Sequence, residues 1–149
     1  MFKVIVILCL VFSIQDCKTQ NKEEKNNVSN KYQSLLQKER WITNLILGLN
    51  SRNTKYKLTK FVPRKFAGNI TSFTDKNKFV SSYVAFCGND NFTTVSGKYV
   101  FLDTDKIKIG VDSVSYSGEW KKPTQYRKLI YQTFIISTKN DTIILTKEK

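Results

Sequence analysis

Few residue types in this chain of 149 residues could do chemistry, because it has three cysteines and no histidine. The cysteines are Cys9, Cys17 and Cys87. Without histidine, Ser-His-Asp and Cys-His nucleophilic catalysis is excluded, as are the usual histidine-containing zinc sites. A thiol can still be acylated or oxidised to a disulfide. The surroundings of each cysteine therefore decide what it can do.

Cys17 stands directly after an export signal. Met1-Phe2-Lys3 carries one positive charge, and Val4 to Ile14 is an uncharged apolar run broken only by Ser13. As a helix this run would rise about 16 Å, far less than the roughly 30 Å of a bilayer's hydrocarbon core. This length is typical of a signal peptide rather than a membrane span. We therefore predict that residues 1–16 are a signal peptide and that the protein is exported.

A cysteine placed directly after a short apolar run resembles the lipobox of bacterial lipoproteins. Cys17 is accordingly the predicted lipid attachment site, and its acylated N-terminus would hold the protein to a membrane. Asp16 occupies the position where a lipobox favours a small residue. Cleavage by a general signal peptidase, which would give a soluble secreted protein, therefore stays open, as does an uncleaved anchor. Without acylation, a disulfide between Cys17 and Cys87 could form.

The segment that follows Cys17 is polar, and we predict that it is a flexible tether. Residues 18–30 carry almost no apolar side chain, so they cannot bury enough surface to offset the entropy of ordering. Lys22-Glu23-Glu24 resembles the short signals that send Bacteroidota lipoproteins to the outer face of the outer membrane. We expect a tether over residues 17–30 and one domain over residues 31–149. The expected location is the cell envelope, at the outer membrane, with secretion as the alternative.

The chain is strongly basic, with 25 Lys and Arg against 12 Asp and Glu and a net charge of +13. Most of the charge is lysine, whereas arginine is the residue that usually reads phosphates and bases through paired hydrogen bonds. A basic exported domain fits anionic lipid, lipopolysaccharide, acidic glycan or an acidic protein better than nucleic acid. We expect no nucleic-acid partner.

The carboxylates of the central region give little support for an enzyme. Glycosidase chemistry needs two carboxylates about 5–10 Å apart across a cleft. Asp103 and Asp105 are close in sequence, but their neighbours mark a turn. We therefore predict no enzyme, no cofactor and no metal site. The carboxylates considered are Asp90, Asp103, Asp105, Asp112 and Glu119.

The first part of the domain shows helical spacing. Apolar residues recur at intervals of three and four from Tyr32 to Leu49, which predicts an amphipathic helix over residues 31–47. An alternative stays open, in which the helix ends near Arg40 and a strand begins at Trp41.

From residue 55 onward, apolar and polar residues alternate with period two, which is typical of strands. Turn-forming residues at 75–77, 103–105 and 139–141 separate the strands. Seven or eight short strands with no helix between them predict a mainly β fold, a small antiparallel barrel behind one helix. The expected strands lie near 56–61, 70–73, 79–86, 92–102, 106–111, 114–120, 129–137 and 142–146.

Several motifs between residues 70 and 147 occur in a known group of proteins. They are Cys87-Gly88-Asn89-Asp90-Asn91-Phe92, Ser96-Gly97-Lys98-Tyr99, Lys106-Ile107-Lys108-Ile109 and the closing Thr142-Ile143-Ile144-Leu145. Together they resemble a pattern of small bacterial lipocalin-like and META-type lipoproteins. The resemblance implies a lipocalin-like barrel attached to the cell envelope.

An eight-stranded barrel is either filled by its own side chains or just able to hold one small apolar ligand. Aromatic residues are the candidates to line such a cavity, and they could equally form the core. The sequence thus predicts an exported, non-catalytic binding or structural protein. The alternative is a secreted interaction module, such as an enzyme inhibitor, with a loop over 119–123. The candidate ligand-binding residues are Phe79, Tyr83, Phe86, Tyr99 and Trp120.

Overall fold

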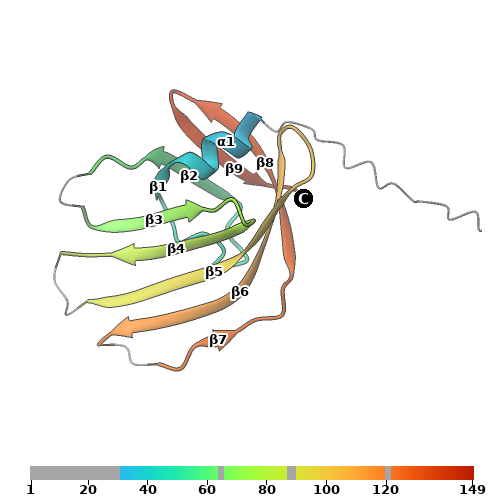
Figure 1. Ribbon diagram of the computed structural model, residues 1–149. Coiled ribbons are helices and arrows are strands. Elements are labelled where there is room, and N and C mark those ends of the chain that lie inside the picture. The colour runs from blue at the N-terminus through green and yellow to red at the C-terminus, as the bar shows by residue number, and fades with distance from the viewer. Residues whose placement is uncertain (1–30, 64–65, 87–89, 120–121) are drawn as a thin grey trace, which may run out of the picture.

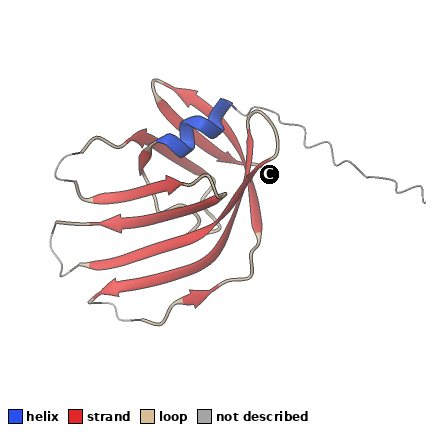
Figure 2. Cartoon of the chain, viewed as in Figure 1, coloured by secondary structure: helices blue, strands red, loops and turns tan. Residues whose placement is uncertain are grey.

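The computed structural model describes residues 31–63, 66–86, 90–119 and 122–149 (Figure 1). In these ranges one helix, α1 (Lys31–Lys38), precedes an antiparallel sheet of nine strands (Figure 2). The predicted mainly β fold with a leading helix is confirmed. The strands are β1 (Arg40–Thr43), β2 (Lys55–Lys60), β3 (Gly68–Phe73), β4 (Lys78–Val84), β5 (Asn91–Phe101), β6 (Lys106–Gly118), β7 (Gln125–Tyr126), β8 (Tyr131–Lys139) and β9 (Thr142–Lys147).

The sheet closes on itself. Its strand order is β5-β4-β3-β1-β2-β9-β8-β6-β7, and a further pairing of β5 with β6 completes a ring. Strands β3 to β6 follow one another as neighbours, whereas β1 lies between β2 and β3. The short β7 pairs with β6 beyond the part of β6 that pairs with β8. Closure gives the eight strands of the ring, β1 to β6, β8 and β9, partners on both sides, which is how barrels remove exposed sheet edges.

Alternation along the strands sends apolar side chains into the barrel. In β2, Tyr56 and Leu58 are buried, while Lys55 and Lys57 are exposed. In the neighbouring β9, Ile143 and Leu145 are buried in the same way. Because successive strand residues point to opposite faces, this pattern fixes which face becomes the core.

The predicted helix over residues 31–47 is wrong, because α1 ends at Lys38 and β1 begins at Arg40. The alternative with an early helix end is the correct one. Aromatic and β-branched residues favour strands, and Trp41-Ile42-Thr43 is such a run. In β1 the side chains of Trp41 and Thr43 both point into the core, which a continued helix could not achieve.

The apolar residues after β1 belong to a loop that folds into the barrel. Leu47 is fully buried, and its backbone N–H donates to the hydroxyl oxygen of Ser81 over 2.9 Å. The backbone N–H of Gly48, at a φ of 75°, donates to the Tyr56 hydroxyl over 3.2 Å. Ile46 and Leu49 pack against the core as well. The spacing that suggested a helix therefore comes from a buried loop.

The sequence predicted two strands, at 106–111 and 114–120. The structure instead has one continuous strand, β6, over this region. The register of β5 against β6 shifts between Ser96 and Gly97, which accommodates the strong bend of these long strands. A Cβ atom at Gly97 would lie 2.1 Å from the carbonyl oxygen of Gly110. Glycine is thus required where the two backbones approach.

Candidate functional site

An open groove lies between α1 and the hairpin formed by β8 and β9. Its volume is about 750 Å³. We call it the Trp41 groove. Its lining combines apolar, charged and amide side chains, which suits recognition of a molecule with both apolar and polar parts. The lining residues are Leu35, Glu39, Trp41, Lys60, Thr138, Asn140, Asp141 and Ile143.

The groove exists because two strand ladders end at different points. The pairing of β2 with β9 stops at Leu58 and Ile143. Beyond that point, β2 continues to Lys60 with β1 as its partner, whereas β9 stays paired with β8 up to Thr142. The two pairs of strands therefore separate, and α1 passes across the space between them (Figure 1).

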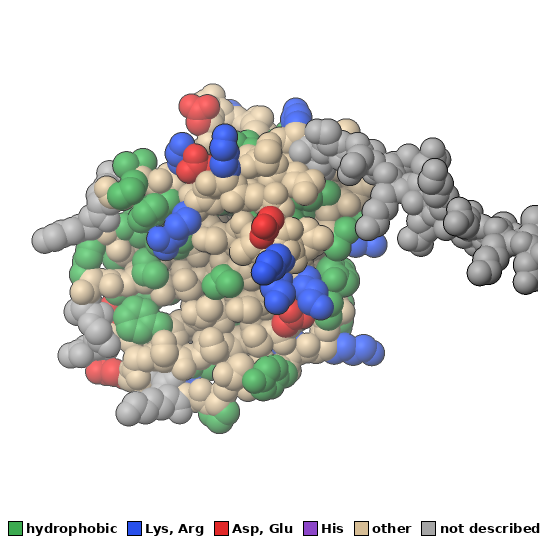
Figure 3. Space-filling view, viewed as in Figure 1, with side chains coloured by type: hydrophobic (Ala, Val, Ile, Leu, Met, Phe, Trp, Pro, Cys, Tyr) green, Lys and Arg blue, Asp and Glu red, His purple; other side chains and the backbone are tan. Residues whose placement is uncertain are grey.

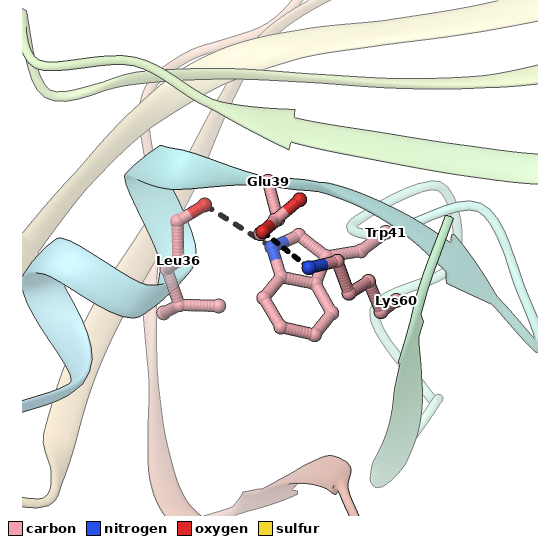
Figure 4. A network of polar contacts seen from close by, with 4 residues as sticks. All are labelled: Leu36, Glu39, Trp41 and Lys60. Atoms are coloured by element: carbon pink, nitrogen blue, oxygen red, sulfur yellow. Dashed lines mark hydrogen bonds and ion pairs between the residues drawn. The ribbon is translucent and has the colours of Figure 1, made fainter. Parts of the chain in front are cut away.

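Trp41 forms the floor of the groove and is held firmly. Its side chain is 2% exposed, and its indole Nε1–H donates to the carbonyl oxygen of Leu36 over 3.1 Å (Figure 4). The last carbonyls of a helix have no partner within the helix, so this bond also stabilises the end of α1. Ile143 lies beside the floor and is buried, whereas Leu35 on the rim is 40% exposed.

An ion pair lies beside the indole ring (Figure 4). The Lys60 ammonium and the Glu39 carboxylate are 2.6 Å apart, with 63% and 30% of their side chains exposed. Exposed ion pairs contribute only about 0–1 kcal/mol. A ligand could therefore separate the two charges at small cost and use either one.

The opposite rim is a tight turn in an uncommon backbone conformation. Asn140 and Asp141 have φ angles of 47° and 60°, in the left-handed region that asparagine and aspartate tolerate best. The hydroxyl of Thr142 donates to the carbonyl oxygen of Asn140 over 3.4 Å. This turn, which the sequence predicted, fixes two polar side chains at the edge of the groove.

The barrel interior, in contrast, is filled with aromatic rings. Tyr56 and Phe134 meet edge to face with centroids 5.7 Å apart, and Phe73 meets Tyr99 in the same way at 5.3 Å. Phe79, which is fully buried, lies 6.3 Å from Phe73. These contacts have the geometry of a packed core.

The described candidate ligand-binding residues fall into two places. Phe79 and Tyr99 lie together in the packed interior, each with its ring against Phe73. Tyr83 is half-buried near the end of β4, 6.3 Å from Phe92, and Phe86 just beyond is 66% exposed. Trp120, like Cys17 and Cys87, lies outside the described residues.

The phenol of Tyr99 connects the barrel to α1. It donates to the carbonyl oxygen of Thr74 and accepts a hydrogen bond from the Gln37 amide over 2.8 Å. Burial raises the pKa of Tyr99, the bond from Gln37 acts in the opposite direction, and the carboxylate of Asp75 raises it further. The phenol therefore stays protonated and positions the helix that forms one side of the groove.

The groove was not predicted from the sequence, because the boundary between α1 and β1 was not placed correctly. The predicted helix over residues 31–47 contained both Glu39 and Trp41, and the alternative with a strand from Trp41 gave no indication of which segments would border that strand. The useful signal was the aromatic and β-branched run Trp41-Ile42-Thr43 directly after three charged residues. Lys60 carried no signal, because its partner in the structure is 21 residues away in sequence.

Comparisons of the chain with protein-family models, curated proteins and solved structures find no match. Function must therefore be argued from the chain's own residues. Among the residues that the structure describes, no helix is long and apolar enough to cross a bilayer. The same residues contain no cluster of three or more His, Cys, Asp or Glu side chains that could hold a metal ion.

Proposed function

We propose that the protein is an exported, non-catalytic binding protein and that its ligand occupies the Trp41 groove. The observation that carries this proposal is the contrast between a filled interior and an open groove. Tyr56, Phe79, Tyr99 and Phe134 occupy the space where a barrel of this size would hold a ligand. The groove of about 750 Å³ falls within the usual size range of small-molecule sites.

The lining indicates the chemistry of the ligand. Trp41, Ile143 and Leu35 contribute apolar groups to the lining, and Lys60, Glu39 and Asn140 contribute charge and hydrogen-bonding groups close to them. A small amphipathic molecule with an apolar part and a polar head matches this mixed lining. The side chains of the groove need to do no chemistry in this role, only to bind.

Export and attachment at Cys17 complete the proposal. The support is the apolar run before Cys17 and the polar tether after it. Intact-mass measurement of the protein from a bacterial host, with a Cys17→Ser control, tests this part. We expect a mature chain that starts at Cys17 and carries a diacylglycerol and an acyl group. An unmodified chain would favour the secreted alternative.

Binding in the groove is tested with dodecanoate, an amphipathic probe, by titration calorimetry. Leu35→Glu places a charge on the apolar rim and should weaken binding at least tenfold. Leu45→Glu is the matched control, because Leu45 is also 40% exposed and does not line the groove. Equal affinity in both variants and the parent protein would contradict the proposal.

A further inference from the structure

The backbone of β2 contributes hydrogen-bonding groups to the Trp41 groove in addition to its side chains. Successive residues of an antiparallel strand direct their N–H and C=O groups to opposite edges. The N–H of Phe61, directly after β2, donates to the carbonyl oxygen of Arg40 over 2.9 Å, and the carbonyl oxygen of Lys57 accepts from the N–H of Asn44 over 3.3 Å. The odd-numbered residues of this segment therefore bond toward β1.

The even-numbered residues bond in the opposite direction, toward β9. The carbonyl oxygen of Thr54 accepts from the N–H of Lys147 over 2.7 Å, and Leu58 is the last residue of β2 in register with β9, opposite Ile143. Lys60 is the next residue in this series. Its N–H and C=O therefore point to the side on which β9 would continue, away from β1.

The ladder is interrupted before it reaches Lys60. If the register of β2 with β9 continued, Asp141 would lie opposite Lys60, but Asp141 belongs to the turn before β9 and has a φ of 60°. Both residues line the groove. Among the described residues, neither the strand register nor any other hydrogen bond gives the Lys60 backbone a partner on this edge. The groove is thus offered one backbone donor and one backbone acceptor by the same residue.

This pair of groups matches the backbone of a single amino acid. A residue opposite Lys60 in an antiparallel ladder would donate its N–H to the Lys60 carbonyl oxygen and accept from the Lys60 N–H. In an N-acylated amino acid, one carbon atom separates the amide N–H from the α-carboxylate, as it separates N–H from C=O in a peptide residue. Both hydrogen bonds can therefore form together. A simple fatty acid has the acceptor and lacks the donor.

The side chains around Lys60 suit the two ends of such a molecule. Leu35, Trp41 and Ile143 supply apolar groups for an acyl chain. The Lys60 ammonium can pair with a carboxylate once it leaves Glu39, and this costs little because the ion pair is exposed. In the view of Figure 3, acidic and basic side chains lie close together near α1 and the tip of the β8–β9 hairpin. The polar end of the ligand therefore meets charges of both signs, which suits a head with both a donor and an acceptor.

We infer that the Trp41 groove binds an N-acylated amino acid and that the Lys60 backbone holds it as an added strand residue. The inference rests on the proposed function of the groove and names its class of ligand. The amide N–H of the ligand donates to the Lys60 carbonyl oxygen, and its carboxylate accepts from the Lys60 N–H. Extending a sheet edge in this way is a common mode of peptide recognition, in which main-chain hydrogen bonds give affinity.

Two ligands that differ by one methyl group test the bond to the Lys60 carbonyl oxygen. N-dodecanoylglycine has an amide N–H, whereas N-dodecanoylsarcosine carries a methyl group on the same nitrogen. Both are titrated into the full chain by calorimetry, below the concentrations at which they form micelles. N-dodecanoylglycine should bind roughly three- to tenfold more tightly, the usual effect of one hydrogen bond. Equal affinity for the two ligands would overturn the inference.

Lys60→Pro tests the other hydrogen bond, because proline has no backbone N–H. Lys60→Ala is the matched control, since both variants lose the ammonium and only one loses the N–H. Pairing of β1 with β2 does not use this N–H, and proline is tolerated at a strand edge of this kind. N-dodecanoylglycine should bind Lys60→Pro roughly three- to tenfold more weakly than Lys60→Ala. Equal affinity in two folded variants would overturn the inference, and the comparison of the two ligands in the parent protein decides it if Lys60→Pro does not fold.

Dodecanoate separates this inference from the proposed function. If dodecanoate binds and the two acylated amino acids bind equally well, the groove stands as a binding site and the inference fails. If none of the three ligands binds, the proposed function fails and the inference fails with it. Preference for N-dodecanoylglycine, with binding weakened in Leu35→Glu, is the result expected from both.

Discussion

The barrel interior and the floor of the Trp41 groove both contain a large aromatic ring, yet the two places differ in packing. Tyr56 in the interior is enclosed, with Phe134 against it at 5.7 Å. Trp41 in the groove is backed by the core and bonded to Leu36, but a volume of about 750 Å³ lies open in front of it. Residue type alone therefore does not distinguish a filled core from an open groove; the groove arises where the β2–β9 and β1–β2 strand ladders separate.

The comparison separates stability from binding. Interior rings contribute mainly to the free energy of folding, because truncating them leaves a cavity among atoms that cannot fully rearrange. On the proposed function, the exposed rim residues of the groove, such as Leu35 and Lys60, should contribute mainly to affinity, because truncating them leaves no buried cavity. Substitutions in the two regions should consequently have different effects on unfolding and on dodecanoate binding.

The largest effect is expected from Phe134→Ala in the interior. Phe134 is 2% exposed and packs against Tyr56, so its loss should cost about 3–5 kcal/mol of unfolding free energy. Urea denaturation measures this cost, and the folded variant should keep its affinity for dodecanoate. A loss below about 1 kcal/mol would mean that the interior is loosely packed, and it would remove the contrast with the groove.

Trp41→Phe should affect both quantities, because Trp41 belongs to the core and to the groove. It removes the donor to the Leu36 carbonyl, which should cost about 1–3 kcal/mol of stability, and it should also weaken dodecanoate binding. Trp120→Phe makes the same chemical change at the other tryptophan and serves as control. If Trp41→Phe lowers stability without changing affinity, the indole is only a core residue.

Glu39→Gln should change stability by less than about 1 kcal/mol, since the pair with Lys60 is exposed. The freed ammonium of Lys60 should then bind the carboxylate of dodecanoate a few-fold more tightly, in a salt-dependent way. Calorimetry at low and high salt measures both effects. Weaker binding in this variant would show that the polar head does not lie near Lys60.

The smallest effect concerns the helix that borders the groove. The pKa of Tyr99 is raised in the folded protein, so its phenol ionises first in the unfolded chain as pH rises above about 10. Above that pH the unfolded state binds fewer protons than the folded state at this group, and stability falls with pH. Tyr99→Phe should lose stability less steeply between pH 9 and pH 11. Urea denaturation at several pH values measures the unfolding free energy. If this free energy falls equally steeply with pH in Tyr99→Phe and in the parent protein, burial does not raise the pKa of Tyr99 as described.

Much of the fold could be predicted from the sequence, because strands and turns are local features. The alternation at Lys106-Ile107-Lys108-Ile109 and the turns at 75–77, 103–105 and 139–141 all correspond to structure. The end of α1 was not predictable from spacing, since Leu45, Ile46 and Leu49 continue the helical pattern by coincidence. The loop that contains them is held instead by Leu47, which is buried and whose backbone N–H donates to Ser81, a residue 34 positions away.

The groove could not be predicted for the same reason. It depends on where the β2–β9 ladder stops, at Leu58 and Ile143, and on a pairing that spans most of the domain. Phe79 and Tyr99 were predicted to bind a ligand because their side chains are aromatic. Residue type could not show whether these rings line a cavity or fill the core. Export and the acylation of Cys17 stay predictions from the sequence.

Quenching of Trp41 tests the central claim most directly. Trp120→Phe leaves Trp41 as the one tryptophan of the chain. Bromine-labelled dodecanoate, whose heavy atoms quench a tryptophan in contact with them, is titrated against this variant, with unlabelled dodecanoate as control. We expect saturable quenching of Trp41 that disappears in the further variant Leu35→Glu. Saturable binding by calorimetry without quenching would place the ligand elsewhere and contradict the account.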